Sequence, residues 1–256
     1  MKKQKRLGLC LFLTIALLCS CKKTIDDYPL ANLRAVVSFN FDYYHNSDCG
    51  VYIQMEGVVD EVNRVITVSV PTDADLTRLR PTIILSPWTT CSPQNLEAVD
   101  FSDGPVEYEV TAQSGKKAYY TVTVTSDYIY QDASLVRLVL SDIPISSDIQ
   151  PDPLDPTSGL SGTPDKYSDG AVLDIPLPQG WSCQYDMSSQ RTHLDMSASS
   201  HGCTIEVDDS GEGGVNYRAF TDMDAIDYTY PVVFRITSQS GNVVRYTVTV
   251  KEKETV

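Results

Sequence analysis

The chain has 256 residues and is strongly acidic, with a formal net charge of −14 and an isoelectric point near 4.5. A surface of this sign repels phosphate backbones and anionic lipid headgroups, which argues against nucleic-acid binding and favours a neutral or cationic partner. The length allows one large domain or two domains of ordinary size.

The first segment, residues 1–20, has the layout of a secretory signal. Four cations precede an apolar run over residues 7–18, which is shorter than the roughly 20 apolar residues of a spanning helix. The stretch LCSC that ends at Cys21 resembles the lipobox of bacterial lipoproteins, in which a small residue precedes the lipidated cysteine. We therefore predict lipidation of Cys21 and a tether over residues 21–32, with ordinary signal-peptidase cleavage as the alternative.

The sequence contains two related copies of one predicted strand pair. The sequence PVEYEVTAQSGKKAYYTVTV, from Pro105, has a related copy, PVVFRITSQSGNVVRYTVTV, from Pro231. In both copies apolar and polar residues alternate, which is the period of a strand with one buried face. The QSG between the two alternating runs supplies Gly115 or Gly241, which can adopt the positive φ that a tight turn often needs. Each copy therefore predicts a β-hairpin.

Two further segments repeat upstream of the hairpins in the same order. Residues 33–39 parallel residues 135–141, and residues 65–71 parallel residues 172–178. No segment carries apolar residues at helical spacing over three turns, so the chain is predicted to be all-β, with two tandem antiparallel β-sandwich domains. We place the first domain at residues 33–126, the linker at 127–132, where Tyr128 and Tyr130 can stiffen the joint, and the second domain at 133–252.

One region in each copy breaks the repeat. The segment 146–170 of the second copy is rich in Pro, Asp, Ser and Gly, which predicts a long loop. It takes the place that residues 43–57 hold in the first copy. Long excursions on a compact domain are functional or mobile, so this is where the fold accepts variation.

Four cysteines are left once the signal is removed and Cys21 is lipidated: Cys49, Cys91, Cys183 and Cys203. An exported chain with an even number of cysteines permits disulfides, and four cysteines allow three connectivities. If the halves fold separately, the simplest pairs are Cys49 with Cys91 and Cys183 with Cys203. Four free thiols are the alternative, because spacing alone does not bring the Cβ atoms within reach.

Two kinds of residue cluster could bind a metal ion: a group of Cys and His residues, and loops rich in Asp and Glu. Zinc could use Cys183, His193, His201 and Cys203, but only the last two are close in sequence, and an oxidising compartment favours a disulfide. We therefore expect no metal. No acidic loop has the spacing of a calcium-binding EF-hand, although a weak calcium site stays open as an alternative. These acidic loops contain Asp152, Asp155, Asp165 and Asp169; Asp208, Asp209 and Glu212; and Asp222, Asp224 and Asp227.

The chain carries no motif of a known catalytic centre. It lacks Gly-x-Ser-x-Gly, a phosphate-binding glycine loop and His-Glu-x-x-His. We therefore expect no enzyme activity and no cofactor. A facing pair of carboxylates between the domains is the arrangement that would contradict this expectation.

Aromatic residues in predicted loops give the best indication of binding. Trp88 lies in SPWTTCSPQ, Trp181 lies in PQGWSCQ, and Tyr43 and Tyr44 follow the first strand. Flat rings on loops suit neutral sugars, whose C–H faces stack on them. The alternative is that each ring packs against its own domain.

The first domain resembles the immunoglobulin-like modules of surface lipoproteins from gut Bacteroidetes. The likeness is carried by GVVD from Gly57, ITVSVP from Ile66, DLTRLRP from Asp75, DFS from Asp100 and the closing hairpin. The second domain departs from the pattern in its middle, where PQGWSCQYDMSSQRTHLDM stands. Asp26 and Asp27 are similar, in part, to the acidic surface-export signals of such lipoproteins.

The resemblance implies a lipoprotein tethered to the outer membrane, facing the cell surface, with immunoglobulin-like sandwiches. From it and from the residues we predict a non-catalytic binding or adhesion module, with carbohydrate as the favoured ligand. Its partners would be the membrane, through the lipid on Cys21, and a neutral polysaccharide or a partner surface protein. The alternative is a structural spacer or an assembly subunit of a surface complex.

Overall fold

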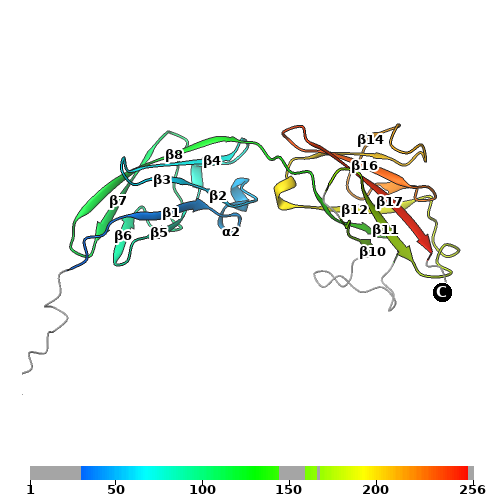
Figure 1. The fold of residues 1–256 in the computed structure, drawn as a ribbon, viewed down its shortest axis with the longest axis horizontal. Helices are drawn as coiled ribbons and strands as arrows, with labels where there is room; N and C mark the ends of the chain where they lie inside the picture. The colour runs from blue at the N-terminus through cyan, green and yellow to red at the C-terminus, as the bar shows by residue number, and fades with distance from the viewer. Residues whose placement is uncertain (1–29, 144–158, 166–167, 253–256) are drawn as a thin grey trace, which may run out of the picture.

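The computed structural model describes residues 30–143, 159–165 and 168–252, which form two β-sandwiches placed end to end (Figure 1). The all-β fold predicted from the sequence is confirmed. Within the described ranges, no helix has the length and apolar character needed to cross a membrane. Cys21 and residues 1–20, on which the anchor prediction rests, lie outside the described residues.

The N-terminal sandwich packs a three-stranded sheet, β2-β1-β5, against a five-stranded sheet, β3-β4-β8-β7-β6. The inward residues of both sheets form one hydrophobic core, in which Phe39 lies edge-to-face on Tyr108 with ring centroids 5.4 Å apart. The strands are β1 Val36–Phe41, β2 Met55–Glu56, β3 Val58–Asp60, β4 Val65–Pro71, β5 Thr82–Leu85, β6 Thr89–Ser92, β7 Val106–Ala112 and β8 Lys117–Tyr128.

The C-terminal sandwich repeats this plan with a four-stranded sheet, β10-β9-β12-β15, and a five-stranded sheet, β11-β17-β16-β13-β14. Its core is separate from the first and centres on Phe234, Tyr246 and Leu138, all fully buried. The strands are β9 Leu135–Leu140, β10 Leu160–Gly162, β11 Ala171–Leu177, β12 Gln190–Met196, β13 Thr204–Asp208, β14 Arg218–Ala219, β15 Ala225–Ile226, β16 Val232–Thr237 and β17 Val243–Glu252.

The sequence repeat corresponds to equivalent strands. The two predicted hairpins are β7-β8 and β16-β17, and their turn glycines have the expected positive φ, 81° at Gly115 and 88° at Gly241. One pair in each sandwich differs from the antiparallel expectation, because β4 runs parallel to β8 and β11 runs parallel to β17. Alternation of apolar residues determines which face of a strand is buried, but it does not determine whether the strand runs parallel or antiparallel to its neighbour.

The linker, residues 127–132, makes hydrogen bonds to both sandwiches through Tyr130. Tyr130 is fully buried, and its hydroxyl accepts a hydrogen bond from the backbone N–H of Tyr52 at 3.2 Å. Its backbone N–H donates to Gln239 Oε1, and its carbonyl accepts from the N–H of Ser240, both at 3.2 Å. The ring of Tyr128 packs edge-to-face on that of Tyr130. We call this region, where Tyr130 contacts both sandwiches, the junction.

The structure has the four described cysteines free, which is the alternative to the two expected disulfides. Cys49 ends the 3-10 turn Ser47–Cys49, and its side chain is buried in the core of the N-terminal sandwich. Its Sγ lies 3.8 Å from the carbonyl oxygen of Arg78. Cys91 lies on β6, and Cys203 donates to the carbonyl oxygen of Asp132 at 3.2 Å. Cys183 is exposed in the loop after β11. Pairing within each half was plausible by count, but the fold gives each thiol different neighbours.

Candidate functional site

Trp88 lies at the end of the N-terminal sandwich that is far from the junction. Its turn joins β5 to β6, and β5 ends beside the start of β1, whereas the end of β1 lies near the junction. The side chain is 75% exposed, as a binding residue would be.

Trp181 lies at the opposite end of the molecule. It follows β11, whose last residue, Leu177, pairs with Glu252 at the end of β17, and β17 runs away from the junction. The indole is half-buried, packs against the core and lies 5.3 Å from the ring of Tyr185. The structure therefore supports the packing interpretation for Trp181, and the two tryptophans do not form one site.

Tyr43 and Tyr44 lie at the junction, on the short helix α2 Tyr43–Asn46. The helix begins there because Asp42 caps it, accepting from the N–H of His45 at 3.1 Å. The two phenol rings lie against each other with centroids 3.9 Å apart, and both are exposed. They form an aromatic surface at the junction, in which the two ring planes are tilted by 33°.

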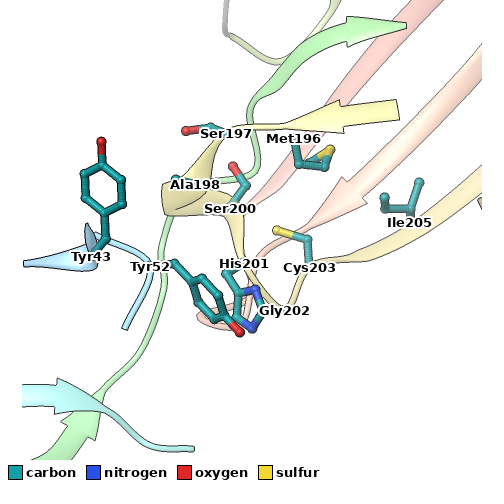
Figure 2. Close-up of a pocket in the computed structure, with 10 residues that line it drawn as sticks. All are labelled: Tyr43, Tyr52, Met196, Ser197, Ala198, Ser200, His201, Gly202, Cys203 and Ile205. Atoms are coloured by element: carbon teal, nitrogen blue, oxygen red, sulfur yellow. The ribbon is translucent and has the colours of Figure 1, made fainter. Parts of the chain in front are cut away.

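A pocket of about 450 Å³ opens between the sandwiches at this place (Figure 2). Tyr43 and Tyr52 line it from the N-terminal sandwich, and the segment from Met196 to Ile205 lines it from the other side. Its volume is within the range of roughly 300–1,000 Å³ that is usual for small-ligand sites. Of the four predicted binding residues, Tyr43 is the one that lines this pocket.

The centre of the pocket is a stacked pair, Tyr52 and His201, with ring centroids 3.9 Å apart and planes tilted by 32°. The buried ring of Tyr130 lies behind His201, with its centroid 5.6 Å from the imidazole. The sequence gives no indication of a role for Tyr52, and it indicates His201 only as a candidate zinc ligand. Their one sequence signal was their position in segments that differ between the two copies.

The wall of the pocket in the C-terminal sandwich has an unreactive thiol, that of Cys203. Burial raises the pKa of the Cys203 thiol to about 11, and the carboxylate of Asp132 adds to this effect, so the thiol stays protonated at neutral pH. A 3-10 turn at Ala198–Ser200 closes the wall, held by a hydrogen bond from Ser134 N–H to Ser200 Oγ at 2.9 Å. Ser197, just before this turn, also lines the pocket, and its hydroxyl shares a hydrogen bond with that of Ser199 at 2.7 Å.

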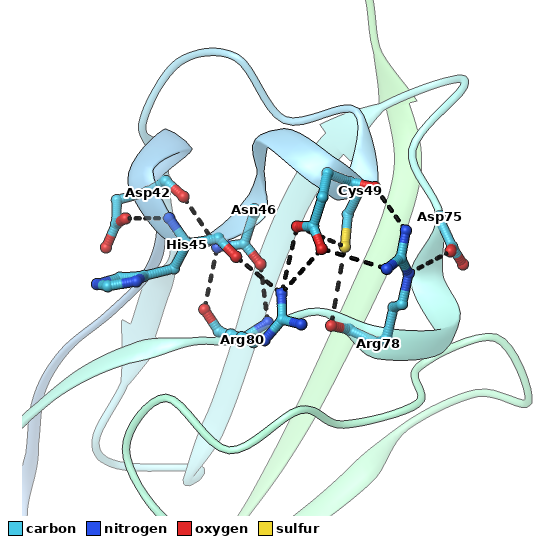
Figure 3. Close-up of polar contacts among 8 residues, drawn as sticks. Asp42, His45, Asn46, Cys49, Asp75, Arg78 and Arg80 are labelled. Carbon is cyan, nitrogen blue, oxygen red and sulfur yellow. Dashed lines mark hydrogen bonds and ion pairs between the residues drawn. The ribbon is translucent and has the colours of Figure 1, made fainter.

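Polar contacts of α2 and of the residues that follow it hold this helix to the N-terminal sandwich (Figure 3). The fully buried Asn46 donates to the carbonyls of Asp42 and Arg80, at 2.9 and 3.0 Å, and accepts from the N–H of Arg80 at 2.8 Å. Asp48 pairs with Arg78 and Arg80, each at 3.2 Å. Partial desolvation opposes ionisation of Asp48, but the two guanidinium groups lower its pKa. The aromatic surface therefore rests on a rigid base.

The four residues considered for zinc are apart. His193 lies on β12, between Asp222 at 2.6 Å and Asp195 at 2.9 Å, while His201 stacks on Tyr52. Over the described ranges, no group of three or more His, Cys, Asp or Glu side chains is placed to hold a metal ion.

The acidic loops that the structure describes are held by internal contacts. Asp208 accepts from three backbone N–H groups of residues 214–216, and Asp169 pairs with Arg245 at 2.9 Å. Arg218 bridges Asp209 and Asp224 at 2.8 and 3.3 Å. Asp152 and Asp155 lie outside the described residues.

Comparison with known proteins gives one informative match. No curated protein matches the chain. Two solved structures have low similarity: a proposed glycoside hydrolase from Bacteroides thetaiotaomicron VPI-5482 (12% identity over 86% of this chain and 83% of that chain, TM-score 0.31) and a proposed secreted protein from Bacteroides fragilis NCTC 9343 (19%, 38% and 94%, TM-score 0.25). At these TM-scores neither bears on fold or function. Residues 50–124, most of the N-terminal sandwich, match the family model described as "SGBP, N-terminal", so this sandwich is similar to a domain of glycan-binding surface proteins.

Proposed function

We propose that the protein is a non-catalytic, lipid-anchored surface module that binds a neutral glycan in the junction pocket. The observation that carries this proposal is the family match over residues 50–124, because that family is one of surface glycan-binding proteins. The matched range includes Tyr52, which forms the centre of the pocket. Lipidation of Cys21 would place the module on the outer membrane, as the resemblance to Bacteroidetes lipoproteins implies.

The chemistry of the pocket suits an uncharged sugar. The rings of Tyr43, Tyr52 and His201 offer faces on which the C–H side of a pyranose can stack, and Ser197 offers a hydroxyl for its polar edge. The formal charge of −14 disfavours acidic polysaccharides. A neutral glycan is the ligand that satisfies both conditions.

The lining of the pocket does not support glycoside hydrolysis. None of its ten lining residues is Asp or Glu, whereas most glycosidases use a pair of carboxylates that flank the scissile bond. The protonated Cys203 is a poor nucleophile. The module would therefore retain a glycan without cleaving it.

Affinity electrophoresis of the mature chain in gels that contain single neutral polysaccharides tests the proposal. We expect at least one polysaccharide to retard the wild type, and Tyr43→Ala and His201→Ala each to bind about tenfold more weakly, since a lost stack costs about 1.4 kcal/mol. Tyr230→Ala, which removes an exposed tyrosine of the C-terminal sandwich, is the matched control and should bind normally. Absence of retardation by any neutral polysaccharide would refute the proposal.

A spacer role is a second candidate, favoured by the junction. The hydrogen bonds of Tyr130 to Tyr52, Gln239 and Ser240 tie the sandwiches together, as a rigid stalk requires. If the polysaccharide panel is negative, a partner protein recovered by cross-linking at the cell surface would support this role.

A further inference from the structure

One end of the N-terminal sandwich has properties that the glycan pocket does not explain. Three segments form it, residues 30–35, 86–89 and 112–118, and we call it the tether end because the described chain begins there. Ser114 N–H donates to the carbonyl of Ala31 at 3.0 Å, and Thr89 Oγ1 donates to that of Leu33 at 3.1 Å. These contacts join the three segments into one surface.

Apolar side chains project from the tether end. Trp88 is 75% exposed, Leu33 is 60% exposed and Leu30 is 54% exposed. Trp88 also has a φ of 61°, in the left-handed region where a bulky residue is an outlier. A backbone that glycine would occupy more easily holds an indole out into solvent, and such strain is concentrated at functional positions.

The three segments of the tether end carry three cations, Arg34, Lys116 and Lys117, and no Asp or Glu, in a protein with 34 acidic and 20 basic residues. The β3–β4 turn beside them adds Arg64 but also Asp60 and Glu61, and the Tyr120 hydroxyl donates to Glu61 at 2.6 Å. The tether end is therefore less acidic than the chain as a whole. Lys117 pairs with Glu109 from β7 at 2.7 Å, and Lys116 is exposed in the turn. Exposed Trp and Leu beside Lys is the composition of a membrane-interface surface.

The tether end lies near the predicted anchor in sequence. Cys21 and Leu30 are nine residue steps apart, and a fully extended chain of that length spans at most about 32 Å. The junction lies beyond the far end of β8, a strand of twelve residues or about 40 Å. Of the two ends of this sandwich, the one with the exposed apolar surface is the one that the predicted anchor would hold close to the lipid.

We propose that the tether end is a membrane-docking surface. Trp88, Leu33 and Leu30 enter the headgroup region of the outer leaflet, and Lys116 binds anionic headgroups. The proposal rests on the proposed lipid anchor and is independent of the glycan pocket. Docking would stand the N-terminal sandwich on the membrane and hold the junction pocket away from it, where a long polysaccharide can reach.

Tryptophan fluorescence can test this docking directly, because the chain has only two tryptophans. The mature chain from Lys22, with an N-terminal hexahistidine segment, is bound to phosphatidylcholine–phosphatidylglycerol vesicles through a nickel-chelating lipid. This attachment replaces the acyl anchor, so the result does not depend on lipidation. In the Trp181→Phe variant, we expect the emission of Trp88 to shift to shorter wavelength and to be quenched by brominated phosphatidylcholine.

Two variants serve as controls on the same vesicles. In Trp88→Phe the remaining Trp181 should keep its emission, and in Trp88→Phe/Trp181→Phe/Tyr230→Trp an exposed indole in the C-terminal sandwich should escape quenching. Without the nickel lipid, Lys116→Gln should lower vesicle binding about fivefold, whereas Lys251→Gln, on β17, should not.

The outcomes separate this proposal from the glycan proposal. Emission of Trp88 that vesicles leave unchanged would overturn the docking surface and leave the pocket untouched. Emission that a neutral polysaccharide alters instead would place the glycan at the tether end and contradict both proposals. Quenching of Trp88 in a chain that no polysaccharide retards would support docking while the glycan function fails.

Discussion

At the scale of the residue, Asp208 shows how one carboxylate orders an acidic loop. It is 1% exposed and accepts from the N–H groups of Gly214, Val215 and Asn216 at 2.7–3.1 Å, and from Ser210. Burial alone would raise its pKa, but these donors lower the pKa well below its ordinary value of 3.8. The carboxylate therefore stabilises the fold wherever it is ionised.

We predict that Asp208→Asn lowers the free energy of unfolding by about 2 kcal/mol at pH 7, because an amide replaces a charged acceptor. A group with a depressed folded pKa stabilises above its unfolded value and loses this contribution as the pH falls. The deficit should therefore shrink below about pH 3.8. Urea unfolding at several pH values, with the exposed Asp103→Asn as control, measures it; a deficit independent of pH would contradict the assignment.

His193 gives a prediction of the opposite sign. Burial disfavours its protonation, but hydrogen bonds to Asp222 and Asp195 outweigh burial and raise its pKa above 6.5. Arg137 pairs with the same Asp195 at 2.5 Å. A raised folded pKa means that the stabilisation is complete below about pH 6.5 and is lost as the pH rises through the folded value. Wild type should thus lose more stability than His193→Gln as the pH rises above 6.5; parallel pH profiles from urea unfolding would refute this.

At the scale of the element, local patterns predicted what local interactions determine. The hairpins at Pro105 and Pro231 were predictable because alternation and a turn glycine act within a few residues. The parallel direction of β4 and β11 was not predictable, because it depends on their pairing with β8 and β17, the strands that close each domain. The pocket was not predictable either, since Tyr52 and His201 are distant in sequence and meet only when the sandwiches join.

The junction is the element on which the pocket depends. Tyr130→Ala removes a fully buried ring from between the sandwiches and should cost about 3 kcal/mol of unfolding free energy. It should also increase the radius of gyration in small-angle scattering, because the sandwiches then move independently. Tyr130→Phe, which removes only the acceptor for the Tyr52 N–H, should cost about 1 kcal/mol and leave the radius unchanged. Equal scattering from all three proteins would show that other contacts hold the junction.

At the scale of the whole molecule, two functions are assigned to different places. The tether end carries Trp88 and the cations that suit a lipid surface, and the junction carries the aromatic pocket that suits a neutral glycan. The pocket lies beyond the far end of β8, so a docked protein would present it away from the membrane. Composition describes the whole chain and not the local cluster of Arg34, Lys116 and Lys117, which is why composition alone argued against contact with anionic lipids.

The central claim is that a neutral glycan binds at the junction. Hydrogen–deuterium exchange of the mature chain, with and without the polysaccharide that retards it most, tests this claim most directly. The account predicts slower exchange in residues 43–52 and 197–205, which approach the pocket from the two sandwiches, and unchanged exchange in residues 86–89. Protection confined to residues 86–89, or to the loop around Trp181, would contradict it.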